Sequence, residues 1–151
     1  MDRAEQAAQL FLRGYNCAQA VAVAFSDLTG LSPELSAKMA SSFGGGMGRL
    51  REVCGAVSGM LLVTSLLYGY DRPEDDQGKK ELYKLVQSLA EQFRQKNGSI
   101  ICRELLKNPP SDPNPSPRTE EYYRQRPCAA MVYTAAQILD AYIAEHPVEG
   151  E

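Results

Sequence analysis

The sequence predicts an all-α fold, a single-domain bundle of about six to seven helices with its four cysteines gathered at one end. Three observations lead to this prediction. Apolar residues recur at helical spacing, capping residues stand before the apolar segments, and no segment shows the alternating pattern of a strand. The chain has 151 residues, of which 44% are hydrophobic, which suits one core. We therefore expect one four-cysteine helical domain over residues 1–151.

The first part of the chain predicts three helices. Asp2 and Glu5 form a capping box, and the helix that they begin is expected over 2–13. A glycine-containing break follows, and alanine- and valine-rich sequence predicts a second helix over 17–27. The third helix is expected over 32–41, because this segment opens with a serine, a proline and a glutamate, which are typical of a helix N-terminus.

A glycine-rich run over 44–48 leads to an apolar helix predicted over 53–68. Gly55 and Gly59 stand four residues apart in this helix, so they lie on one face of it. Two interpretations of that small-residue face remain open. It allows the backbone to approach a bound group or a partner helix, or it serves ordinary close helix packing within the monomer.

The next helix is predicted to be amphipathic and to lie on the surface. Asp71 and Glu74 form a second capping box at its start, and Gly98 is a good C-cap at its end. Its apolar residues follow helical spacing, with charged residues between them; they are Leu82, Leu85, Val86, Leu89 and Phe93.

The last part of the chain predicts a short helix, a loop and a long helix. The short helix carries Cys102 and follows Ser99, which can cap it. Residues 108–118 contain five prolines and are expected to form an extended loop. A final helix is expected over 127–145, with Pro127 at its first position.

Each of the four cysteines stands where a helix is expected to begin. They are Cys17, Cys54, Cys102 and Cys128. A helix N-terminus has unpaired N–H groups and the positive end of the helix dipole, so it stabilises an anion. For cysteine that anion is the thiolate, which is both the nucleophile and the metal ligand. We therefore predict these four cysteines as the catalytic residues and the metal ligands of one site.

The spacing of the cysteines limits the chemistry. They are separated by 37, 48 and 26 residues, so there is no CxxC pair of the thioredoxin or zinc-ribbon type and no haem-attachment motif. They can meet only in three dimensions. Four converging thiolates can hold zinc or an iron–sulfur cluster, whereas pairs of thiols can form disulfides. Cysteines are also common packing residues, which is the third interpretation.

The glycine run does not form a phosphate-binding loop, because no GK[ST] follows it and no strand precedes it. We expect no nucleotide. The glycines Gly46, Gly48 and Gly55 are instead predicted to line the cofactor site, where they leave room and offer N–H groups to the sulfurs. Arg49 and Arg51 either balance thiolate charge there or are solvated at the surface.

Composition excludes several classes of protein. The net charge is −3 and the basic residues are scattered, so no nucleic acid is expected as a partner. The N-terminus is polar and the longest apolar run, 55–70, is too short to span a bilayer, so we expect no membrane insertion and a cytoplasmic location. Disulfides rarely serve as structural staples there. His146 is the only histidine and is expected as a helix C-terminal cation, so Cys–His hydrolysis is disfavoured.

The cysteine contexts resemble the C_GCAxxG_C_C family of redox-active proteins, which is marked by four cysteines and a CGAxxG stretch. The matching segments are 14–19, 44–48, 54–59, 98–102 and Cys128. The family is related to the cysteine-bearing domain of split-Soret cytochromes, which is associated with an iron–sulfur centre and adds haem. No haem is expected in this chain, because it lacks the haem-binding cysteine–histidine motif.

The resemblance implies a small helical redox protein. We therefore expect electron transfer or redox chemistry at a four-cysteine metal site, with an iron–sulfur cluster preferred over another thiolate-bound metal. The alternatives are a metal-free dithiol–disulfide oxidoreductase and a structural or interaction protein with packing cysteines. A redox partner protein is expected, and a homodimer is left open.

Overall fold

The computed structural model describes residues 2–148 and is all-α, as predicted. Within these residues six helices have eight or more residues: α1 (Arg3–Leu12), α2 (Cys17–Ala24), α4 (Pro33–Ala40), α6 (Gly55–Tyr68), α7 (Asp76–Asn97) and α10 (Cys128–Glu145). Shorter α-helical segments are α3 (Ser26–Thr29), α5 (Gly44–Met47), α8 (Cys102–Leu105) and α9 (Glu120–Gln125). The ends of the predicted 1–151 domain, residue 1 and residues 149–151, lie outside the described residues.

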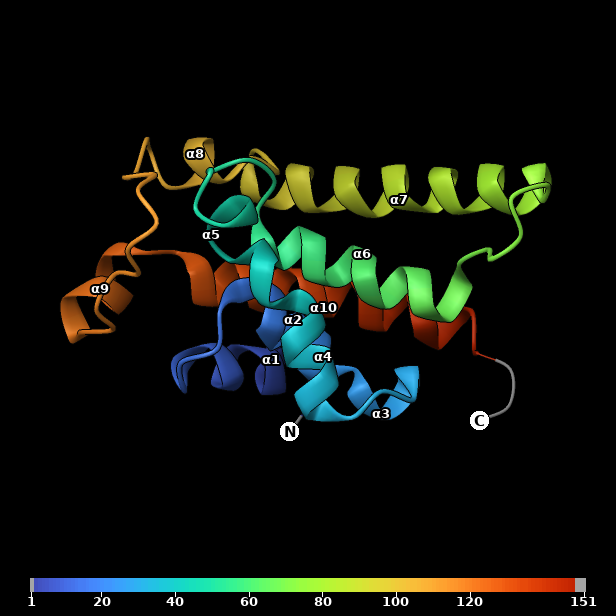
Figure 1. The fold of residues 1–151 in the computed structure, drawn as a ribbon, viewed down its shortest axis with the longest axis horizontal. Coiled ribbons are helices and arrows are strands. Elements are labelled where there is room, and N and C mark those ends of the chain that lie inside the picture. The colour runs from blue at the N-terminus through green and yellow to red at the C-terminus, as the bar shows by residue number, and fades with distance from the viewer. Residues whose placement is uncertain (1, 149–151) are drawn as a thin grey trace.

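The helices pack around one core. Helix α1 lies against α10 and α2, and α2 also lies against α6 and α4. Helix α7 runs along the outside of α6 and α10 for much of the length of the molecule (Figure 1). The N-termini of α6 and α10 lie at the end of the molecule that also holds α5, α8 and α9 (Figure 1). This arrangement brings the starts of several helices together. The largest fully buried side chains are Phe11, Phe25, Phe93, Met60, Leu89 and Leu139.

Side chains cap helices in the first part of the chain, and the Asp2 half of the predicted Asp2–Glu5 capping box forms. The Asp2 carboxylate accepts a hydrogen bond from the Glu5 N–H at 2.8 Å. Asn16 and Gln19 form a reciprocal capping box at the start of α2, with distances of 2.8 and 3.1 Å. Ser32 accepts from the Leu35 N–H at 3.0 Å. Each of these side chains satisfies an N–H that the helix itself leaves unpaired, which fixes where the helix begins.

Several helix boundaries differ from the prediction, including the start of α6, which lies at Gly55 and not at residue 53. The second helix was expected to run to residue 27, but it ends at Ala24, because the backbone of Phe25 (φ −107°, ψ 10°) leaves the helical region before α3 begins. The predicted capping box of Asp71 and Glu74 is wrong. Helix α7 begins at Asp76, and the N-cap is Asp75, whose carboxylate accepts from the Gly78 N–H at 2.8 Å. Asp75 offers the same capping chemistry closer to the apolar face of the helix.

The C-terminal part of the fold holds one unexpected helix. Residues 108–118 form the predicted irregular loop, but α9 follows it and was not predicted. Thr119 caps α9 by accepting from the Tyr122 N–H at 3.1 Å. Pro127 is the N-cap of α10 rather than its first residue, so the helix begins at Cys128. The C-cap of α7 is Gly98, as predicted, with a left-handed φ of 92°.

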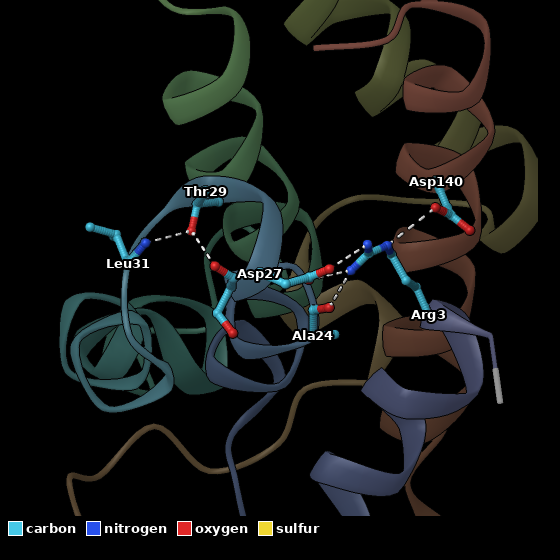
Figure 2. Close-up of polar contacts among 7 residues, drawn as sticks. Arg3, Ala24, Asp27, Thr29, Leu31 and Asp140 are labelled. Carbon is cyan, nitrogen blue, oxygen red and sulfur yellow. Dashed lines mark hydrogen bonds and ion pairs between the residues drawn. The ribbon is translucent and has the colours of Figure 1, made fainter. Parts of the chain in front are cut away.

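One arginine of α1 contacts α2, α3 and α10 away from the cysteines. Figure 2 shows the Arg3 guanidinium between Asp27 of α3 and Asp140 of α10. Its two donors reach the Asp27 carboxylate at 2.6 and 2.8 Å, and Nη1 also donates to the Ala24 carbonyl at 2.9 Å. The ion pair holds the pKa of the Asp27 carboxyl below its usual range. Within residues 2–148 no helix is both long and apolar enough to cross a membrane.

Candidate functional site

Each cysteine lies at the start of a helix, as the sequence predicts. Cys17, Cys102 and Cys128 are the first residues of α2, α8 and α10. Cys54 is the N-cap of α6. All four are free thiols, and all four line one cavity of about 60 Å³. The prediction that the four cysteines gather in one place is therefore confirmed.

A short antiparallel contact brings two of the cysteines together. Val53 and Ile101 form an isolated β-bridge, the only pairing of this kind among residues 2–148. On either side of it the Cys54 N–H donates to the Ile100 carbonyl at 2.7 Å, and the Cys102 N–H donates to the Glu52 carbonyl at 2.6 Å. The backbone therefore fixes the start of α6 beside the start of α8.

The two glycines of the CGAxxG stretch allow α6 to approach α2. A Cβ added to Gly55 would lie 3.1 Å from the Cβ of Cys17, and one added to Gly59 would lie 2.6 Å from the Ala18 carbonyl oxygen. The second distance is shorter than a side chain tolerates. The small-residue face thus serves close helix packing within the monomer, and this packing places Cys17 beside the N-terminus of α6.

The glycine run makes a left-handed turn. Gly45, Gly46, Met47 and Gly48 have consecutive φ values of 66°, 71°, 70° and 64°. Glycine favours this region, because other residues meet a steric penalty there. A Cβ on Gly46 would lie 2.7 Å from the Cβ of Cys102. Gly46 and Gly55, which the sequence predicts to line a cofactor site, both line this cavity, and Gly45 joins them, but Gly48 is not among its lining residues.

Arg51 follows the glycine run and lies inside the protein, with 3% of its surface exposed. Its Nη1 donates to the Cys102 sulfur at 3.7 Å, and its Nε donates to the Pro110 carbonyl at 2.9 Å. Of the two interpretations left open by the sequence, the one that places Arg51 beside the cysteines fits, because this arginine is not solvated at the surface. Arg49 instead holds the proline-rich loop, because its Nε donates to the Asp112 carbonyl at 2.8 Å and its Nη1 to the Ser116 hydroxyl at 3.2 Å.

Two further arginines and a tyrosine line the cavity and were not predicted. Arg118 donates to the carbonyls of Phe11 and Tyr15, each at 3.0 Å. The Arg126 guanidinium lies 5.0 Å from the ring centre of Tyr122. Arg118 ends the proline-rich loop, and Tyr122 and Arg126 lie between that loop and α10. Arg126 stands two residues before Cys128, and this proximity was the one available signal in the sequence.

The thiols of Cys17 and Cys128 form an unequal pair. A side-chain hydrogen bond between them is the largest influence on both, and it raises the pKa of Cys17 and lowers the pKa of Cys128. Burial raises the pKa of Cys17 further. The positive charges of Arg126, Arg118 and Arg51 add to the lowering for Cys128. Cys128 is therefore the thiol that ionises most readily in the cavity.

The other two thiols stay protonated more readily. Burial raises the pKa of Cys54 to about 12, although the N–H groups of Ala56 and Val57 oppose the effect. Burial also raises the pKa of Cys102, and the hydrogen bond from Arg51 lowers it by less. The site thus sets Cys128, whose pKa is lowered, apart from three thiols whose pKa values are raised.

The cysteines do not form a ready metal site. Among residues 2–148 no three histidine, cysteine, aspartate or glutamate side chains are placed to bind one metal ion together. The sulfurs share a cavity, but their arrangement does not fit a single bound ion without movement of the side chains.

The fold and the site define a small helical protein with a cavity lined by four free thiols and three arginines. Its family follows from comparison of the sequence. The chain belongs to the family described as "Putative redox-active protein (C_GCAxxG_C_C)", whose sequence model matches residues 15–142. The predicted family and its general redox character are thereby confirmed. Neither the curated proteins nor the solved structures give a significant match.

Proposed function

We propose that this protein carries out thiol–disulfide redox chemistry, with Cys128 as the nucleophile and Cys17 as the second thiol. The observation that carries the proposal is the interacting pair of thiols in one cavity, in which the pKa of Cys128 is lowered and that of Cys17 is raised. A thiolate is the attacking species in disulfide exchange. The family description as redox-active supports the same chemistry.

The proposed reaction is the two-electron reduction of a disulfide R–S–S–R. The Cys128 thiolate attacks one substrate sulfur, the substrate S–S bond breaks, and the first RS⁻ leaves. The Cys17 thiol then loses its proton and attacks the Cys128 sulfur, which releases the second RS⁻. The products are two RSH, which carry the two protons of the protein thiols, and a Cys17–Cys128 disulfide. The substrate is reduced and the protein dithiol is oxidised.

The surroundings suit the two roles. Cys128 stands at the N-terminus of the 18-residue helix α10 and near Arg118 and Arg126, all of which favour its thiolate. The hydrogen bond from Cys17 keeps that thiol protonated until Cys128 has reacted and lost its charge. Cys54 and Cys102, whose pKa values are raised by burial, then act as thiols that shape the cavity; Cys128 is buried to the same degree and differs from them in its lowered pKa.

A second candidate function is electron transfer through a four-thiolate metal site, with an iron–sulfur cluster as the preferred group. The observation that favours it is that all four cysteines line one cavity together with Gly45 and Gly46. Such a cluster would supply one-electron transfer. The side chains would have to reorient, since no three potential ligands within residues 2–148 are placed for a common ion.

The test separates these functions and the packing alternative. The protein is purified without oxygen, analysed for iron, zinc and sulfide, and then treated with iodoacetamide at pH 7. We expect Cys128 to be alkylated first, and we expect Cys17→Ser to change its reaction rate more than Cys54→Ser does. Stoichiometric iron and sulfide would overturn the proposal in favour of the metal site. Four unreactive thiols in the folded protein would favour packing cysteines instead.

A further inference from the structure

One charged side chain in the cavity lacks a charged partner. Nη2 of Arg51 is fully buried and has no hydrogen-bond partner among the described residues. The other nitrogens of this guanidinium reach only the Cys102 sulfur and the Pro110 carbonyl. A buried cation with an unused donor is unfavourable unless an anion or a polar group meets it.

The cavity as a whole carries excess positive charge. Three arginines line it, namely Arg51, Arg118 and Arg126, and none of its lining residues is acidic. Arg118 donates to two carbonyls and to the hydroxyl of Tyr123, so its charge is not neutralised there. One thiolate at Cys128 balances at most one of these three charges. The protein has a net charge of −3, so this positive interior is a local feature.

We propose that this cavity binds the anionic group of the substrate, and that Nη2 of Arg51 is its principal donor. The inference rests on the proposed function, because it names the class of disulfide that Cys128 reduces. That class is a low-molecular-weight disulfide with a carboxylate on each arm. Arginine suits a carboxylate, because the hydrogen bond between the two is assisted by their opposite charges.

The surface beside the cavity can hold the second half of the disulfide, which carries the second carboxylate. The cavity of about 60 Å³ holds one short arm, but not the whole disulfide. An adjoining hollow of about 360 Å³ shares Leu105, Leu106 and Arg126 with it. Lys107 and Arg124 also line this hollow, and both are exposed. The second carboxylate would lie against these cations, with the S–S bond between the two groups and near Cys128.

The first experiment compares three disulfides of similar size and different charge. They are 3,3′-dithiodipropionate, which is a dianion, bis(2-hydroxyethyl) disulfide, which is neutral, and cystamine, which is a dication. We measure the rate of Cys128 oxidation by mass spectrometry at low ionic strength. The dianion is expected to react at least about tenfold faster than the dication, with the neutral disulfide between them. Equal rates for the dianion and the neutral disulfide would overturn the inference.

The variant Arg51→Met tests the donor. It should abolish the preference for the dianion over the neutral disulfide. The preference is measured as the ratio of the two rates of Cys128 oxidation, so a change in Cys128 reactivity that affects both disulfides equally cancels out. The control is Arg94→Met, which removes an exposed arginine of α7 that pairs with Glu91 outside the cavity. It should keep the preference. An unchanged ratio in Arg51→Met, in protein with native circular dichroism, would also overturn the inference.

A binding measurement separates this inference from the proposed function. The thioether 3,3′-thiodipropionate has both carboxylates but no S–S bond, so it can bind without redox chemistry. Calorimetry should show binding that weakens at least about tenfold in Lys107→Ala/Arg124→Ala, a variant of exposed residues that keeps the core. If this compound binds but no disulfide oxidises Cys128, the proposed function fails and the anion site stands. If disulfides react but the thioether does not bind, the anion site fails alone.

Discussion

At the scale of single residues, Cys54 links the site to stability. Its pKa is about 12 in the fold and 9.0 as an ordinary thiol, so folding favours the neutral form. The stabilisation is complete below pH 9 and is lost as the pH rises toward 12. We expect the free energy of unfolding to fall more steeply above pH 9 in the wild type than in Cys54→Ala, by about 1.4 kcal/mol per pH unit.

Urea denaturation at several pH values from 8 to 11 measures this difference. The packing that Cys54→Ala removes is the same at every pH, so only the two slopes are compared. Parallel slopes would show that the Cys54 thiol ionises as easily in the fold as in the unfolded chain.

Gly46 is the position at which an added side chain would press most directly on the site. In Gly46→Ala the new Cβ meets the Cβ of Cys102 and the Cα of Arg51, at 2.7 and 2.8 Å, and it also occupies a left-handed backbone position. We expect a loss of about 2–4 kcal/mol in the free energy of unfolding, from backbone strain and overpacking together. The matched control is Gly30→Ala, which is also left-handed but has open space around it, and which should lose only about 1 kcal/mol. Equal losses in urea denaturation would argue against a tight contact at Gly46.

Some residue-level features could be predicted and others could not. Asn16 is a strong capping residue directly before Cys17, so the local sequence is enough to place that thiol at a helix start. The burial of Arg51 was left open, because it depends on the left-handed turn of the glycine run and on the proline-rich loop that covers the arginine. Both are contacts between distant segments, which local patterns do not encode.

At the scale of the elements, the contact between α2 and α6 sets the position of Cys17. In Gly59→Ala the added Cβ would press against the Ala18 backbone, so the helices must move apart. We expect a loss of about 1–3 kcal/mol in the free energy of unfolding and slower formation of a Cys17–Cys128 disulfide. Ser58→Ala, at a half-buried position on the same helix, should leave both unchanged. If Gly59→Ala kept the wild-type rate of disulfide formation, this helix contact would not position the thiol.

The proline-rich loop over 108–118 covers Arg51, which lines the cavity, because the Pro110 carbonyl accepts from its Nε, and the loop also contacts Arg49. Its five prolines reduce the entropy that is lost when the loop becomes ordered. Replacement of all five by glycine and serine should leave the helices intact but loosen the cover. We expect unchanged far-ultraviolet circular dichroism and several-fold faster alkylation of the buried thiols by iodoacetamide. Unchanged alkylation rates would make the loop a simple surface connection.

The start of a helix could be predicted where the sequence offers one candidate N-cap residue, but not where it offers two. Asp71 and Asp75 both lie before α7, and the structure uses the second one. Helix α9 was not predicted. It is polar, and its six residues are too few to show the spacing of apolar residues that is typical of a helix. Its position matters, since Tyr122 lines the cavity and Arg126 directly follows the helix.

At the scale of the whole molecule, the topology explains how cysteines far apart in the sequence meet. Helices α6 and α10 begin at the same end of the molecule, and α8 lies there too (Figure 1). A bundle that aligns helix N-termini in this way gathers their first residues. The sequence predicted this gathering from the shared position of the cysteines at helix starts. It could not predict the unequal pairing within the group, because that depends on which side chains touch.

The most direct test of the account is an equilibrium titration of the whole protein in mixtures of reduced and oxidised dithiothreitol, followed by peptide mapping of the trapped thiols. We predict a two-electron transition in which Cys17 and Cys128 become one disulfide while Cys54 and Cys102 remain free thiols. The Cys128→Ser variant should show no such transition. A disulfide that joins Cys54 and Cys102 instead, or four thiols that stay reduced throughout, would contradict it.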